Sequence, residues 1–337
     1  MSRKKLKLTD DRTTFKPFTY PQFYDFWLQH EQSHWLHSEL PFHEDIKDWK
    51  TKLTENEKQF LTHIFRFFTQ GDLDVAGGYV NNYLPIFKQP EVRMMLLGFA
   101  AREAVHIAGY SHLIETLGMP ESTYSEFMEY QEMKDKHDYV LQAASTTGSK
   151  EDVAKNIAIF SAFTEGLQLF SSFIMLLNFQ RHGKMKSMGQ IIAWSIADES
   201  LHCEAMIKLF RVYIEENREI WNDELKSQLY VIATKMVELE DKFIDLAFSM
   251  GDMEKLNAQD VKQYIRYIAD RRLISMGLKG IFKVKKNPLI WVEEILNAPS
   301  HTNFFENKST DYAKGALTGS WGDIWASNKE TKNGEHK

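Results

Sequence analysis

The sequence predicts an all-α protein built as a helical bundle, and three observations support that prediction. Apolar residues recur at the helical period through long stretches, among them residues 91–118, 157–179 and 189–215. Acidic and histidine side chains stand on the same stripes as these apolar residues. The composition, 43% hydrophobic and 26% charged over 337 residues, is that of a globular protein. The predicted core therefore contains ionisable side chains that need partners.

The N-terminal section leads into the first core helix. Residues 1–20 show no period and predict an extended arm, whereas the aromatic-rich residues 21–34 predict a helix. Thr54-Glu55-Asn56-Glu57 has the pattern of a capping box, in which the first and fourth residues bond each other's backbone N–H groups. A long helix is therefore expected to begin just after Thr54.

That helix brings an acidic residue onto its apolar face. Phe65 and Phe68 precede Asp72 at helical spacing, so Asp72 falls on the stripe that faces the core. Asp74 is two residues further and points in another direction. Of these two aspartates, only Asp72 should therefore face the core. A metal ion is a natural partner for a buried carboxylate, so Asp72 is the preferred metal ligand. Taken alone, Asp72 is better explained as the cap of a turn after Gly71.

The helix predicted for residues 91–118 carries a Glu-x-x-H motif. Glu103, His106 and Tyr110 are spaced by three and four residues, so their side chains share one face. Met95 and Phe99 continue this face, which should therefore be buried. A single motif of this kind is weak evidence, because both residue types are common on helix surfaces.

Residues 122–144 predict another helix, and residues 157–179 form the most apolar run of the chain. This run is long enough to cross a membrane. Glu165, Gln168 and Asn178 lie within it, which favours the central helix of a bundle instead. Glu165 is the sole acidic residue between positions 153 and 197, so it is a candidate metal ligand. A buried, protonated glutamate is the alternative.

The next predicted helix, residues 189–215, repeats the motif as Glu199-Ser200-Leu201-His202, directly after Asp198. Two further helices are expected at residues 223–250 and 257–278, and a short one starts at Pro288. Residues 306–337 are polar and rich in Gly, Ser and Lys, which predicts a mobile tail. The sequence thus predicts one helical domain over residues 1–305, followed by a tail.

The two motifs form part of a larger repeated pattern. Asp72 lies 31 residues before Glu103, and Glu165 lies 34 residues before Glu199. A carboxylate on each of two helices and Glu-x-x-His on each of two others is the pattern of ferritin-like dimetal carboxylate proteins. Four carboxylates balance the charge of two divalent ions, and an oxygen-rich set without thiolates suits iron or manganese. The predicted ligands are Asp72, Glu103, His106, Glu165, Glu199 and His202.

Tyr110 follows the ligand His106 by one helical turn on the same buried stripe. A buried tyrosine usually has a structural role, with its hydroxyl hydrogen-bonded. Beside two redox-active metal ions, one-electron oxidation of Tyr110 to a tyrosyl radical is the more specific interpretation.

With these residues in place, the sequence resembles the small, radical-generating subunit of class I ribonucleotide reductase. The resemblance runs from Trp35 to Tyr312. The family's E-x-x-H-x-x-x-Y and D-E-x-x-H motifs match Glu103 to Tyr110 and Asp198 to His202. Its other matching positions are Asp72, Glu165, Trp35 with Glu39, and Phe304-Phe305-Glu306 with Tyr312.

The resemblance implies an activity and partners. The dimetal site would react with an oxidant and leave an oxidising equivalent on Tyr110. That equivalent would pass through His106, Asp198 and Trp35, and then by way of Tyr312 to a separate large subunit that reduces ribonucleotides to deoxyribonucleotides. The resemblance also implies a homodimer whose C-terminal tail docks on the large subunit. Apolar tail residues that suit this docking are Trp321, Ile324 and Trp325.

Two positions depart from the family pattern around the radical tyrosine. Leu169 stands where phenylalanine is frequent, and Ser195 stands where an aliphatic residue is frequent. A hydroxyl group near Tyr110 is expected to hydrogen-bond it and shorten the lifetime of its radical.

Other functions remain as alternatives. The same scaffold serves small-molecule oxidases or desaturases, and ferritin-like bundles also store iron, but neither role uses Trp35, Tyr110, Asp198 and Tyr312 together. A net charge of −6 argues against nucleic-acid binding. A single cysteine, Cys203, and the lack of a secretory signal favour the cytoplasm. Iron is the preferred metal, although manganese and a mixed pair suit the same ligands; the oxidant and the substrate's phosphorylation level stay open.

Overall fold

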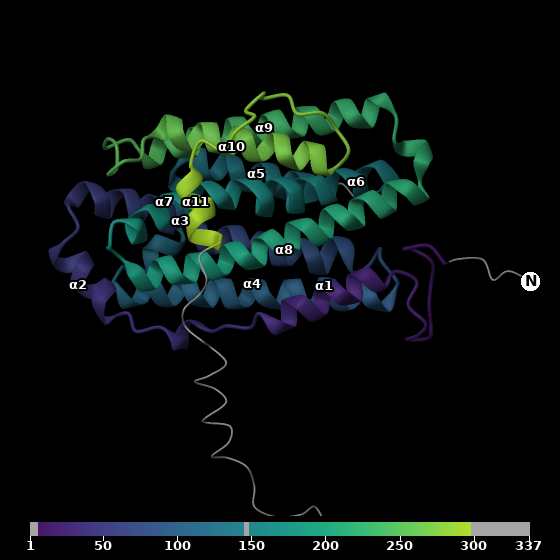
Figure 1. Cartoon of the computed structure of the whole chain (residues 1–337), viewed down its shortest axis with the longest axis horizontal. Helices are drawn as coiled ribbons and strands as arrows, with labels where there is room; N and C mark the ends of the chain where they lie inside the picture. The colour runs from purple at the N-terminus through teal and green to yellow at the C-terminus, as the bar shows by residue number, and fades with distance from the viewer. Residues whose placement is uncertain (1–5, 145–147, 298–337) are drawn as a thin grey trace, which may run out of the picture. The chain divides into compact units, whose positions relative to one another are not determined.

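Long helices dominate the computed structural model, which describes residues 6–144 and 148–297. The long helices lie side by side (Figure 1), and the described residues contain no strand, apart from an isolated bridge between Met253 and Leu256. The helices are α1 Pro21–Gln32, α2 His43–Thr51, α3 Glu55–Gly78, α4 Pro90–Thr116, α5 Gln131–Ala144, α6 Lys150–Ile157, α7 Leu169–Arg181, α8 Lys186–Glu216, α9 Asp223–Ala247, α10 Ala258–Ser275 and α11 Ile290–Asn297. The all-α prediction is confirmed.

The predicted boundaries hold for most core helices and fail in two places. Residues 122–144 are not one helix: two short 3₁₀ turns, Glu121–Tyr124 and Glu126–Glu129, precede α5. The Ser125 hydroxyl donates to the Ser122 carbonyl, and such local bonds compete with helix formation. The short helix expected at Pro288 begins at Ile290 instead. The acidic segment that forms α2 was not predicted to be helical.

The most apolar run of the sequence is a continuous helix, Lys150–Arg181, made of α6, a π-helical segment η5 (Ala158–Gln168) and α7. Its length and composition would suffice to span a membrane, but its apolar part is buried inside the bundle. It is therefore a core helix, as expected from its internal polar residues. π-Helical turns are rare and frequently occur at functional sites. Glu165 lies inside this one.

The helix α8, which carries the second Glu-x-x-H motif, is fixed at its start by α2. The buried Asp45 accepts hydrogen bonds from the backbone N–H groups of Ser187 and Met188, at 3.0 and 2.8 Å. Asp48 accepts one from Met185, which adopts the left-handed conformation with φ of 51°. Carboxylates at a helix N-terminus satisfy free N–H groups and favour the helix dipole. The short acidic helix α2 thus holds α8 in place.

The bundle places four long helical segments around one point. The helix α3 packs on α4, α4 contacts α8, and α8 packs along η5 and α7. The N-terminal helix α1 lies against both α4 and α8 (Figure 1). Apolar side chains fill the space between them, including Phe65, Phe68, Phe99 and Phe173, each at most 2% exposed. The ionisable residues described below lie within this apolar core.

Candidate metal centre

The six predicted ligands converge on one place in the core. Their donor atoms form two overlapping groups, each with all atoms within 4.8 Å of one another. The groups are Asp72, Glu103, His106 and Glu199, and Glu103, Glu165, Glu199 and His202. All six side chains are 0% exposed. Glu103 and Glu199 belong to both groups, so the arrangement offers two adjacent cation positions with two shared carboxylates.

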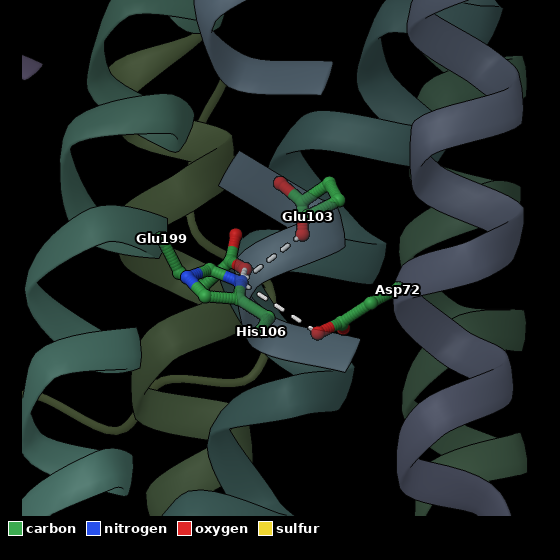
Figure 2. A group of neighbouring side chains, drawn as sticks. All are labelled: Asp72, Glu103, His106 and Glu199. Atoms are coloured by element: carbon green, nitrogen blue, oxygen red, sulfur yellow. Dashed lines mark hydrogen bonds and ion pairs between the residues drawn. The ribbon is translucent and has the colours of Figure 1, made fainter. Parts of the chain in front are cut away.

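Four helical segments, α3, α4, η5 and α8, each contribute one carboxylate to the cluster. Figure 2 shows the first group: Asp72 reaches in from α3, Glu103 and His106 from α4, and Glu199 from α8. The π-helical segment η5 supplies Glu165 to the second group. Helical spacing within α4 and α8 orients the motif residues, and the packing of the helices brings them together.

Both imidazole rings turn the same nitrogen toward the carboxylates. The Nδ1 atom of His106 lies 3.1 Å from Glu103 and from Glu199, and 3.6 Å from Asp72. The Nδ1 atom of His202 lies 3.1 Å from Glu103 and 3.5 Å from Glu165 and from Glu199. Nδ1 is therefore the nitrogen that each histidine offers to a metal ion.

Several carboxylate oxygens of the cluster have no hydrogen-bond donor among the described residues. Both oxygens of Asp72 and of Glu199, together with one each of Glu103 and Glu165, are buried and make no hydrogen bond among the described residues. Burial, assisted by neighbouring carboxylates, raises the pKa of Asp72 and of Glu165 to about 8. An anionic cluster of this kind is costly without cations. The donor set fits two divalent ions.

Protons and metal ions compete for these donors. Burial opposes the protonation of His106 and His202, yet the surrounding carboxylates raise the pKa of both imidazoles well above its ordinary value. Burial also opposes the ionisation of Glu103, but the two histidines lower its pKa to about 2. Because metal ligands must be deprotonated, binding of ions releases protons and weakens as the pH falls.

Tyr110 lies beside the first group in an aromatic environment. Its side chain is 1% exposed, the Phe68 ring stacks on it at 4.1 Å, and the His106 ring lies 6.2 Å away. Its hydroxyl donates a hydrogen bond to Ser195 Oγ at 2.8 Å, so the expected contact between these residues is present. Burial raises the pKa of Tyr110 well above its ordinary value, which keeps the phenol neutral. Leu169 lines a small cavity beside Phe68.

A hydrogen-bonded chain leads from the cluster to Trp35. The Nε1–H group of Trp35 donates to Asp198 Oδ2 at 2.7 Å, and His106 Nε2 lies 3.2 Å from the same oxygen. The ring of Trp35 also stacks on that of His106 at 5.7 Å. These contacts link the three residues that the family resemblance named as a relay.

Arg102 completes this chain, and the sequence reasoning missed it. Its guanidinium group lies 2.9 Å from Asp198 Oδ2 and 3.0 Å from Oδ1. Burial alone would raise the pKa of Asp198, but the hydrogen bond from His106 and the charges of His106 and Arg102 lower it. A signal was present, because Arg102 is one of two arginines in a largely apolar helix and stands directly before Glu103.

Tyr79 was missed as well. Its buried hydroxyl donates to Glu165 Oε1 at 2.6 Å and so holds the ligand that η5 supplies. Tyr79 stands seven residues after Asp72 on the same helical face, which is the spacing that would have revealed it.

Some predicted residues lie elsewhere. Asp74 is outside the cluster, bonded to His137 at 2.6 Å and to Gln70 at 2.8 Å. Tyr312, the three apolar tail residues and the predicted boundary at residue 305 lie outside the described residues. The cysteine Cys203 is buried and forms no disulfide.

A helical bundle whose core holds two histidines and four carboxylates in two overlapping groups defines the class of dimetal carboxylate proteins. The model of the family "Ribonucleotide reductase, small chain" matches residues 12–288. The chain belongs to this family, which confirms the resemblance seen in the sequence.

Individual proteins agree with this assignment. The chain is 57% identical to the probable ribonucleoside-diphosphate reductase small subunit 048L of Invertebrate iridescent virus 3, over 94% of this chain and 88% of that protein. Among solved structures, it resembles the ribonucleotide reductase R2 subunit from Clostridium botulinum, with a TM-score of 0.80, 21% identity, and coverage of 88% and 95%. It also resembles the dimanganese(II)-NrdF of Streptococcus sanguinis, with a TM-score of 0.71, 20% identity, and coverage of 81% and 94%. These structural likenesses support the fold.

The geometry predicts that Asp72 is a metal ligand and that Asp74 is not. Replacing Asp72 with alanine removes a donor of the first group, so we expect the variant to bind fewer than two ions per chain. Replacing Asp74 with alanine should leave the number of bound ions unchanged, because Asp74 bonds His137 instead. Metal analysis after anaerobic loading with Fe(II) measures both. Equal stoichiometry in the two variants would rule out Asp72 as a ligand.

Proposed function

We propose that this chain is the radical-generating small subunit of a ribonucleoside-diphosphate reductase, active together with a separate large subunit. Membership of the family supports the reductase. The observation that supports the radical role is the position of Tyr110, buried against Phe68 and beside the ligand His106. The cytoplasm is the proposed location.

The six clustered side chains would hold the two metal ions. When bound, a redox-active pair supplies the oxidising power by reacting with an oxygen-derived oxidant. We propose iron as the metal, because four carboxylates and two imidazoles suit it. Manganese suits the same donors, and the structural relative from Streptococcus sanguinis carries a dimanganese(II) centre.

Tyr110 is the proposed store of the oxidising equivalent. Its burial excludes water, and the Phe68 ring covers one face of the phenol. Oxidation would remove one electron and the phenolic proton from Tyr110 and pass both to the oxidising centre held by the six clustered side chains. A phenoxyl oxygen has no hydrogen to donate, so the Ser195 hydroxyl, the acceptor before oxidation, would become the donor afterwards.

The transfer route we propose runs through His106, Asp198 and Trp35. Asp198 accepts hydrogen bonds from the rings of Trp35 and His106, and Arg102 keeps its carboxylate ionised and in position. Trp35 lies on the outer side of this chain, where Trp194 packs on it at 5.2 Å. From there the oxidising equivalent would pass to the large subunit by way of Tyr312. We propose that the C-terminal tail docks on the large subunit. The affinity of a chain ending at residue 312 for the large subunit, compared with that of the full chain, tests this docking.

An apolar stripe on α4 supports the proposal of a homodimer. Leu97, Ala101, Ala104 and Ala108 are exposed at successive turns of this helix and are uncharged, and the next exposed residue is Glu115, near the helix end. Neighbouring α3 adds exposed Leu73. Small residues permit close approach of a second helix, and exposed contiguous apolar surface marks an interaction site. Sedimentation of the full chain tests whether two copies associate.

The small-molecule oxidase or desaturase is the weaker alternative. Such an enzyme needs a substrate-sized cavity near the metal ions. The cavity beside Phe68, lined also by Gly71 and Leu169, has room for about one water molecule. The family assignment likewise supports the reductase over the oxidase and over iron storage.

Oxidation of Tyr110 is directly observable. We expect the protein loaded with Fe(II) and exposed to O₂ to give a tyrosyl EPR signal, and the Tyr110→Phe variant to lose it. Tyr83→Phe is the matched control, because Tyr83 is equally buried but bonds the Asn156 carbonyl. A signal that persists in Tyr110→Phe would place the radical elsewhere. Loss of the signal without loss of nucleotide reduction would mean that the metals store the equivalent.

The contact with Ser195 yields a separate prediction. Replacing Ser195 with alanine removes the hydroxyl that reaches Tyr110, so we expect the radical to persist severalfold longer. The decay of the EPR signal at constant temperature gives the lifetime. Ser161→Ala, which changes a buried serine on η5, is the control. Unchanged or faster decay in Ser195→Ala, compared with this control, would show that the hydroxyl does not limit the lifetime.

A further inference from the structure

The two histidines of the candidate metal cluster differ in the hydrogen-bond partner of their outer ring nitrogen, Nε2. His106 directs its outer nitrogen, Nε2, to Asp198 at 3.2 Å. The Nε2 atom of His202 is buried and makes no hydrogen bond among the described residues. A histidine ligand almost always donates its outer N–H to an acceptor, which fixes the tautomer and the orientation of the ring. His202 therefore needs a partner that corresponds to Asp198.

A polar side chain, His30, packs against His202. The two ring centroids are 5.1 Å apart, and Phe99 flanks both rings, at 5.0 Å from His30 and 4.2 Å from His202. His30 is 1% exposed, and neither of its ring nitrogens makes a hydrogen bond among the described residues. A buried polar group without a hydrogen bond is costly. Two neighbouring imidazoles with this same deficit can satisfy each other.

The position of His30 is fixed by the fold. Arg102, which anchors Asp198, also donates to the His30 backbone carbonyl at 3.2 Å. The helix α1 carries His30 and approaches α4 closely at Gly98. A Cβ atom on Gly98 would lie 3.1 Å from Trp27 and 3.5 Å from His30 Nδ1. One guanidinium group thus holds both Asp198, behind His106, and the backbone of His30, behind His202.

The chemistry of His30 suits an acceptor. His30 is buried, and burial disfavours the charged form of an imidazole, which favours the neutral ring. A neutral imidazole has one N–H donor and one free nitrogen acceptor. The carboxylate of Glu31 lies 3.6 Å from His30 Nδ1. This proximity favours the hydrogen on Nδ1 and leaves Nε2 to accept.

We propose that His30 is the hydrogen-bond acceptor for the outer N–H of His202, reached by rotation of the ring or through one bridging water molecule. His30 is then a positioning residue for a metal ligand, as Asp198 is for His106. The inference rests on the proposed dimetal function and deepens it.

A consequence is that the two metal positions are not equivalent. Asp198 is charged and makes His106 the stronger donor, whereas neutral His30 leaves His202 the weaker one. The ion on the side of Asp72 and His106 should be held more tightly than the ion on the side of Glu165 and His202. This asymmetry is a way in which one cluster can load two ions in order.

Anaerobic titration of the full chain with Mn(II), with free Mn(II) followed by EPR, tests the proposal. We expect His30→Leu to weaken one of the two bound ions roughly 10–100-fold and to leave the other unchanged. His30→Gln keeps a side-chain acceptor and should restore most of the affinity. His63→Leu, at another buried histidine that contacts Arg66, is the control for general effects on the core.

Two backgrounds assign the effect to one side of the cluster. Asp72→Ala leaves the His202 side intact, so adding His30→Leu should weaken the remaining ion. Glu165→Ala leaves the His106 side intact, so the same addition should change little. Wild-type affinity for both ions in His30→Leu, or an equal loss in His63→Leu, would overturn the role of His30. A wild-type chain that binds fewer than two Mn(II) ions would instead overturn the dimetal function itself, and the inference with it.

Discussion

The burial of four carboxylates at one point in an apolar core is the constraint on which the rest of the structure depends. Asp72, Glu103, Glu165 and Glu199 are fully buried, and most of their oxygens make no hydrogen bond to any residue that the structure describes. Burying these carboxylates in their ionised form would destabilise the folded protein unless bound protons or cations neutralised their negative charge. Four helical segments must pack within a narrow tolerance to bring the donors together. The capping of α8 by α2 and the π-helical turn around Glu165 both serve that geometry.

Further buried charges lie next to the ligands and are paired with one another. Asp198 adds a further buried negative charge, which Arg102 compensates on one side and which His106 and Trp35 approach on the other. A single carboxylate therefore orients the proposed metal ligand His106 and connects it to the buried ring of Trp35. On the opposite side of the cluster, His30 packs on His202, and among the described residues no carboxylate bonds the outer nitrogen of His202. The route proposed for the oxidising equivalent leaves the cluster on the side where this charged chain exists.

Sequence reasoning recovered the parts of this site that depend on position within one helix. Helical spacing placed Glu103, His106 and Tyr110 on one buried face and separated Asp72 from Asp74, and the structure brings the predicted ligands together. Contacts between different helices were not accessible in the same way. His30 reaches His202 only through the approach of α1 to α4, and the serine turns before α5 depended on local hydrogen bonds that compete with a helix.

Two tyrosines reach the cluster, and their hydrogen bonds explain why Tyr110 is the better proposed site for a stored radical. Tyr79 donates to Glu165, so removal of its hydrogen would free a ligand oxygen and disturb the metal coordination. Tyr110 donates to Ser195, which is not a ligand, so its oxidation leaves every donor of the cluster in place. Ser195 can rotate its hydroxyl from acceptor to donor without moving its helix. Oxidation of Tyr110 would therefore disturb the donor atoms of the cluster less than oxidation of Tyr79 would. This difference supports Tyr110, of these two residues, as the proposed store.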